Sequence, residues 1–245
     1  MISERTIAEK FTSIWKLSFP FLNSNFMRVF NESQVYKFQQ SEVGMPSDVR
    51  YDLVAESAFN IVAKAYNHCS VDDIVSDSEM LNSIVKQTAE SIWLFTKYNK
   101  DELILNENEI EQVIQLANNF LDFIDSHNAT TVNFKPSLKG FGFIPDLEGD
   151  VSIDDILYEV KTVKRNFKTS DLKQLSIYLA LRQVDDNHKS WEYAGLYNPR
   201  TGAYSKFRVS SFVSSVTGGK TPNEAFNDFL DTLIRDMQVD IVSSN

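Results

Sequence analysis

The sequence predicts an α/β fold of the α+β kind, in which helices flank a central mixed β-sheet. Three observations predict it. Apolar residues recur at helical spacing through much of residues 1–128, and short β-branched and aromatic runs replace them over 129–245. Those runs alternate with helical segments in the order strand–strand–helix–strand–strand–helix. Because no clear linker separates the two parts, we expect a single domain over 1–245, with a mainly helical N-terminal part.

The helical part begins with an aromatic-rich segment, residues 1–40, which we interpret as one or two short helices that pack on the main body. The alternative is a binding surface for a partner. Serines at N-cap positions then predict helices over 47–66 and 76–98, the second with a Ser-x-x-Glu capping box. Apolar spacing predicts a third helix over 110–124.

The second part contains the predicted strands and a turn over 148–150. A helix over 171–183 divides the strands into two groups, and a last helix begins at Thr221 and Pro222. The predicted strands are 130–134, 140–147, a strand from 153 or 155 to 163, 192–197 and 204–209.

The composition restricts location and partners. No apolar run reaches the ~18 residues that a membrane-spanning helix needs, so we expect no membrane contact. Cys69 is the only cysteine, which excludes an internal disulfide and favours the cytoplasm. A net charge of −10 argues against coating nucleic acid with the whole surface, although local contact stays open.

Two acidic positions and a lysine form the candidate site. Side chains alternate across a strand, so Glu159 and Lys161 share one face. Asp146 ends the preceding predicted strand, and a turn at 148–150 would bring it to Glu159. Asp150 is the alternative candidate for this first carboxylate. Two carboxylates suit Mg²⁺ or Mn²⁺. The alternative is that Glu159 and Lys161 form an ion pair on a half-exposed strand, and that Asp146 is an ordinary acidic residue of a turn.

Three motifs in order resemble the RecB-like branch of the PD-(D/E)xK nuclease superfamily, across residues 139–183 only. They are Pro145-Asp146, Glu159-Val160-Lys161, and Gln174 with Tyr178 at helical spacing. The resemblance implies a restriction-endonuclease-like core. It also implies Asp146, Glu159 and the Val160 carbonyl as metal ligands, Lys161 as the catalytic lysine, Gln174 and Tyr178 beside the site, and Glu56 as an additional ligand.

A basic run follows the Glu159–Lys161 strand. We predict nucleic-acid contacts from it, while a solvated loop is the alternative reading. The predicted contact residues are Lys164, Arg165, Lys168 and Lys173.

The function expected from these patterns is a Mg²⁺- or Mn²⁺-dependent nuclease that hydrolyses phosphodiester bonds. DNA is favoured over RNA, in phage defence, repair or mobile-element biology. Because the chain is acidic, we expect a protein partner or a second copy to supply part of the binding surface. One alternative is an inactive interaction subunit with the same fold, within a larger nucleic-acid-processing complex; another is a partner-binding protein that uses its aromatic N-terminal segment.

Overall fold

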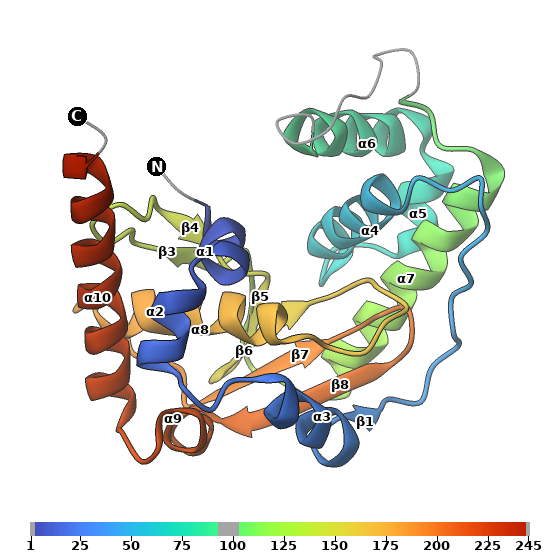
Figure 1. Ribbon diagram of the computed structural model, residues 1–245. Coiled ribbons are helices and arrows are strands. Elements are labelled where there is room, and N and C mark those ends of the chain that lie inside the picture. The colour runs from blue at the N-terminus through green and yellow to red at the C-terminus, as the bar shows by residue number, and fades with distance from the viewer. Residues whose placement is uncertain (1–2, 93–102, 244–245) are drawn as a thin grey trace.

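The computed structural model describes residues 3–92 and 103–243 and contains a mixed β-sheet flanked by helices (Figure 1). The strands are β1 (Tyr36–Lys37), β2 (Val132–Phe134), β3 (Ser137–Leu138), β4 (Leu147–Glu148), β5 (Val151–Ile153), β6 (Ile156–Val160), β7 (Tyr193–Tyr197) and β8 (Ala203–Arg208). The six-stranded sheet has the order β1-β8-β7-β6-β5-β2. Only β6 and β7 run parallel within it, and β3 pairs with β4 separately. The predicted fold class is therefore confirmed.

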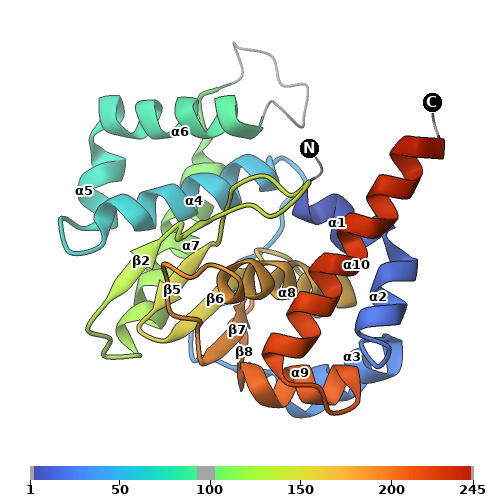
Figure 2. The same ribbon diagram turned by 90° about the vertical axis from the view of Figure 1, so that its left-hand side faces the viewer.

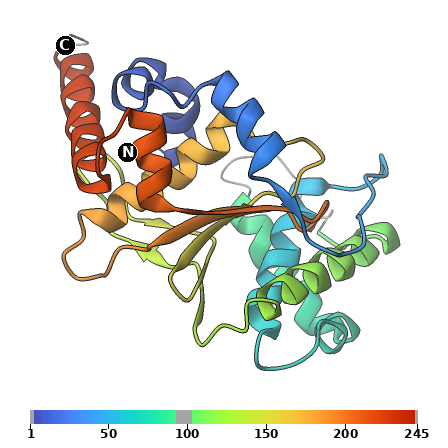
Figure 3. The ribbon, with the colours of Figure 1, turned by 90° about the horizontal axis from the view of Figure 1, so that it is seen from below.

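Helices cover both faces of this sheet (Figure 3). Because strand side chains alternate, Leu157 of β6 packs with one helical layer and Tyr158 packs with the other. Helices α1, α2, α8, α9 and α10 lie on the Leu157 side, and α4 to α7 lie on the Tyr158 side. The helices are α1 (Glu4–Lys10), α2 (Thr12–Ser18), α3 (Ser24–Ser33), α4 (Tyr51–Ala65), α5 (Val71–Ser76), α6 (Ser78–Ile92), α7 (Glu107–Asp125), α8 (Thr169–Gln183), α9 (Val209–Thr217) and α10 (Pro222–Ser243).

The hairpin that carries the candidate site differs from the expected one. Strands β5 and β6 pair antiparallel, with Val151 opposite Tyr158, and the chain turns at Asp154 and Asp155. Asp154 adopts φ of +49°, which aspartate tolerates better than most residues, and its carboxylate accepts hydrogen bonds from Thr130 and Thr131. The chain bends at 149–150 between β4 and β5, but the hairpin turn that leads to Glu159 lies at 154–155 and not at 148–150.

The segment 140–147, predicted as a strand, is instead a tight loop that leads into β4. A Cβ on Gly140 would lie 2.4 Å from the Ile144 carbonyl oxygen, so the loop closes tightly against a residue without a side chain. Phe141 and Ile144 bridge across the loop by backbone hydrogen bonds of 3.1 Å and 3.0 Å. The alternating apolar residues of this segment therefore form a turn and not a strand.

Most of the predicted helices are confirmed, with different ends. The helix expected over 47–66 begins at Tyr51, because the Glu109 carboxylate of α7 accepts the Arg50 N–H at 2.9 Å. The helix expected over 76–98 begins at Ser78, and Asp77 rather than Ser76 caps it by accepting hydrogen bonds from the Glu79 and Met80 N–H groups. Its expected end lies outside the described residues. Helices α5 and α9 were not predicted.

The aromatic N-terminal segment packs into the core, as predicted. Trp15 and Phe19 are 2% and 1% exposed, and the rings of Trp15 and Phe229 lie 4.6 Å apart where α2 meets α10 (Figure 2). Phe21 and Tyr36 are exceptions, at 52% and 57% exposed. Among the described residues, no helix has both the length and the apolar character that crossing a membrane requires.

Candidate active site

The C-terminal end of β6 carries a buried carboxylate beside an ammonium. Glu159 is only 2% exposed, and its Oε1 accepts a hydrogen bond from Lys161 Nζ at 2.6 Å. Its Oε2 is buried without a hydrogen-bond partner among the described residues. Burying such an oxygen is unfavourable, because it loses its hydrogen bonds to water and forms none within the protein. The arrangement therefore leaves one carboxylate oxygen free for a ligand.

Lys161 connects this carboxylate to helix α8. Its Nζ also donates to Gln174 Oε1 at 2.8 Å, and Gln174 Nε2 donates to the Tyr178 hydroxyl at 2.9 Å. Because Gln174 and Tyr178 are four residues apart on a helix, both face β6. The structure thus brings together four predicted site residues, Glu159, Lys161, Gln174 and Tyr178, in one hydrogen-bonded series.

Asp150, rather than Asp146, is the aspartate that meets Glu159. Asp150 comes immediately before β5, next to the Val151–Tyr158 pair, and the Glu159 carboxylate lies near enough to raise its pKa. Asp150 Oδ2 accepts the Val160 N–H at 2.6 Å. A strand residue points its N–H and C=O toward the same neighbouring strand, so the Val160 carbonyl also faces the Asp150 side.

The structure does not place Asp146 beside Glu159, as the predicted hairpin required. Its Oδ1 accepts the Gly140 N–H at 2.8 Å, and it is exposed in the tight loop before β4. The prediction failed because it depended on a turn at 148–150. A sequence signal for the true turn existed, since Asp154-Asp155 separates two apolar runs.

The charges of Asp150, Glu159 and Lys161 change one another's pKa values. Burial raises the pKa of Asp150 well above its usual range, and the nearby Glu159 carboxylate raises it further. Burial also raises the pKa of Glu159, although Lys161 opposes that change. Burial disfavours the Lys161 ammonium, but the charges of Glu159 and Asp150 outweigh it and raise the pKa of Lys161. The lysine is therefore a cation at neutral pH.

A pocket of about 230 Å³ lies between this hairpin and α4, lined in part by Asp150, Val160, Asp52 and Glu56. Glu56 is 43% exposed, and its Oε1 lies 3.8 Å from Lys135 Nζ. Among the described residues, no three His, Cys, Asp or Glu side chains converge closely enough to hold a metal ion. Glu56 borders the pocket together with Asp150, and its charge helps to raise the pKa of Asp150, so its role as an additional ligand stays a prediction.

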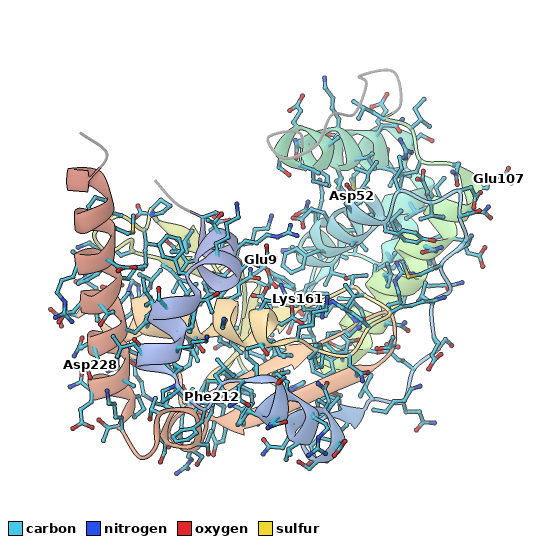
Figure 4. All side chains as sticks on the ribbon, viewed as in Figure 1. Glu9, Asp52, Glu107, Lys161, Phe212 and Asp228 are labelled. Carbon is cyan, nitrogen blue, oxygen red and sulfur yellow. The ribbon has the colours of Figure 1, made fainter. Side chains whose placement is uncertain are left out.

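A larger groove of about 750 Å³ opens on the other side of the β6 exit. Lys161 and Gln174 line it together with α1, including Glu4 and Arg5. Figure 4 shows Lys161 between α1, which carries the labelled Glu9, and α4, which carries the labelled Asp52. Local sequence patterns do not predict this wall, because α1 is more than 150 positions from Lys161 along the chain.

The predicted basic run divides into residues of different roles. Arg165 forms a two-point pair with buried Asp171, at 2.6 Å and 2.9 Å, and Lys168 precedes α8 at its N-cap. Lys164 is exposed. Lys173 packs its ammonium over the Trp15 ring at 5.3 Å, and burial lowers its pKa. The predicted nucleic-acid contact by Lys173 is therefore not supported, because that ammonium is occupied within the fold.

Comparisons with known proteins add no assignment. No protein-family profile matches the chain, and no curated protein sequence matches it significantly.

Proposed function

We propose that this protein is a metal-dependent nuclease that hydrolyses phosphodiester bonds, with DNA favoured over RNA. The observation that carries the proposal is the series Glu159–Lys161–Gln174–Tyr178, with the Asp150 carboxylate on the Val160 N–H and close enough to Glu159 to have its pKa raised. Burying like-charged carboxylates side by side is costly to a fold. Such an arrangement between two open pockets is typical of a site that binds a cation and an anionic substrate.

The residues fit Mg²⁺ or Mn²⁺. The orphaned Glu159 Oε2 and the repulsion between Glu159 and Asp150 are both relieved by a divalent cation. Asp150, Glu159 and the Val160 carbonyl would hold it, and Mg²⁺ commonly binds one or two carboxylates and keeps several waters. When bound, such a cation neutralises phosphate charge and makes a bound water more acidic.

Lys161 acts on the substrate directly, and Gln174 and Tyr178 position it. The Lys161 ammonium lies at the groove, 18% exposed, and donates toward a phosphate oxygen while offsetting the negative charge that develops on it. Gln174 holds the ammonium at 2.8 Å and is held in turn by Tyr178. These contacts orient Lys161 before the substrate arrives, which lowers the cost of ordering it.

The charge distribution supports the participation of a second protein molecule in substrate binding. Glu4 and Glu9 lie along the groove, Asp52 and Glu56 lie along the smaller pocket, and the chain has a net charge of −10. Acidic walls repel a polyanion, so a protein partner or a second copy would supply part of the basic surface. The proposed settings are phage defence, repair or mobile-element biology in the cytoplasm.

A cleavage assay tests the proposal. The protein is incubated with plasmid, linear and single-stranded DNA and with RNA, in Mg²⁺, Mn²⁺ or EDTA. Wild type should cut at least one substrate only with metal, and Asp150→Asn and Lys161→Ala should not. Asp146→Asn is the matched control, since it changes an exposed aspartate four residues away and should retain activity.

Two outcomes would contradict this proposal. If Asp146→Asn loses activity while Asp150→Asn keeps it, the assignment of the site is wrong. If wild type leaves every substrate intact, also with proteins that co-purify with it, the inactive interaction subunit becomes the better reading.

A further inference from the structure

A cationic pocket lies next to the active-site groove. It has a volume of about 270 Å³ and is bounded by Lys37 of β1, by Lys164 and Arg165 of the loop before α8, and by Tyr36. Among the described residues that line it, three are cations and none is an acid. Arg165 is neutralised by Asp171 and Lys37 pairs with Glu42, so Lys164 supplies the positive charge without an ion pair among the described residues. In a chain with a net charge of −10, such a charge in a pocket without acids is complementary to an anion.

The pocket is continuous with the groove through Arg165, which lines both. The backbone from Lys161 to Lys164 spans at most about 10 Å, because an extended residue covers about 3.3–3.6 Å. A strand whose phosphate lies at Lys161 therefore reaches this pocket with a nearby phosphate.

Tyr36 adds an aromatic surface at the rim. Its side chain is 57% exposed at the edge of the sheet. The centroid of its ring lies 5.8 Å from the centroid of the Tyr204 ring on β8. Lys37 pairs with Glu42 beside it, but both side chains are more than 60% exposed. An exposed pair contributes little stability, so a phosphate replaces Glu42 at low cost.

We propose that this pocket is a nucleotide subsite of the nuclease. It binds a backbone phosphate near the scissile bond through Lys37 and Lys164, and Tyr36 stacks on the base of that nucleotide. Arg165 borders the subsite and stays paired with Asp171. Stacking requires an unpaired base, so the substrate class is a strand with single-stranded nucleotides beside the cut. The subsite rests on the proposed function, because Lys161 defines where the cut occurs.

Binding is measured by fluorescence anisotropy in EDTA with full-length Lys161→Ala protein, so that no cleavage interferes. The probes are a labelled single-stranded 12-mer and a blunt duplex. Adding Tyr36→Ala should weaken single-strand binding by about 5- to 150-fold, which is the range for one stacked base, while Tyr36→Phe should bind normally. Adding Lys164→Ala should reduce the slope of log affinity against log salt by roughly 0.7.

Two controls match the changes in type. Phe21→Ala removes an aromatic ring that is 52% exposed, and Lys16→Ala removes an exposed lysine of α2. Neither should alter binding. The subsite is refuted if Tyr36→Ala and Phe21→Ala bind equally, if Tyr36→Ala weakens the blunt duplex as much as the single strand, or if no probe binds.

The two proposals fail in different ways. Metal-dependent cleavage by wild type, together with single-strand binding that ignores Tyr36→Ala, overturns the subsite alone. Binding that depends on Tyr36, together with no cleavage under any condition, supports the subsite as a nucleic-acid site and overturns the nuclease.

Discussion

Replacing Asp150 with asparagine should stabilise the metal-free protein. Asp150 Oδ2 accepts the Val160 N–H at 2.6 Å, and an amide oxygen accepts the same hydrogen bond. The change therefore removes the charge and keeps the contact. Burial and the Glu159 carboxylate raise the pKa of Asp150, which means that the folded protein disfavours its ionised form. Asparagine relieves that cost.

The magnitude follows from the closeness of the two carboxylates, since the Glu159 charge raises the pKa of Asp150. Two unit charges about 5 Å apart repel by about 3 kcal/mol at an effective dielectric constant of about 20. Because the Lys161 ammonium offsets part of this repulsion, we expect a net gain of about 1–3 kcal/mol. For a chain of this size, that gain corresponds to a rise in Tm of about 2–12 °C.

The pH dependence has a definite sign. A carboxyl group whose folded pKa is raised binds more protons in the folded state, so stability falls as pH rises from the unfolded pKa, about 4, through the folded pKa. Asp150 and Glu159 both have raised pKa values, so metal-free wild type should lose stability as pH rises above about 4. Asp150→Asn should show a shallower loss.

Thermal denaturation tests this between pH 4 and pH 8, in EDTA and across a Mn²⁺ titration. Metal should stabilise wild type by about 2.7 kcal/mol at 100 times its Kd, and should have little effect on Asp150→Asn. Asp146→Asn is again the control and should follow wild type. A destabilised Asp150→Asn protein in EDTA that still responds fully to metal would refute the reasoning.

Three further predictions concern the surrounding contacts. Lys161→Ala should lower the cleavage rate by about 100-fold or more while the metal-induced rise in Tm remains, as measured by timed digestion and thermal denaturation. Gln174→Ala should lower cleavage by about 10- to 100-fold through a misplaced Lys161, whereas Tyr178→Phe should cost less, because it removes only the second contact in the series. Arg165→Ala should destabilise the fold by about 1–3 kcal/mol in urea, because Asp171 keeps a buried charge, and adding Asp171→Asn should recover part of the loss. An equal loss in the double variant would show that the Arg165–Asp171 pairing is not the cause.

Local patterns were sufficient for much of the fold. The period-3.6 spacing over 110–124 matches α7, and the alternation that places Glu159 and Lys161 on one face is confirmed by their 2.6 Å contact. The helical pair Gln174 and Tyr178 was also read correctly as sharing a face toward the site. These features depend on neighbours within a few residues, so sequence spacing determines them.

Only the tertiary structure decided which partner each site residue meets. Asp146 and Asp150 are four positions apart, and both precede the strand that carries Glu159, so the choice depended on where the hairpin turns. A hydrogen-bond register is a long-range property, and one competing turn signal is enough to misplace it. For the same reason, neither the contact of Lys173 with Trp15 nor the α1 wall of the groove could be read from spacing, because each joins segments distant in the chain through packing alone.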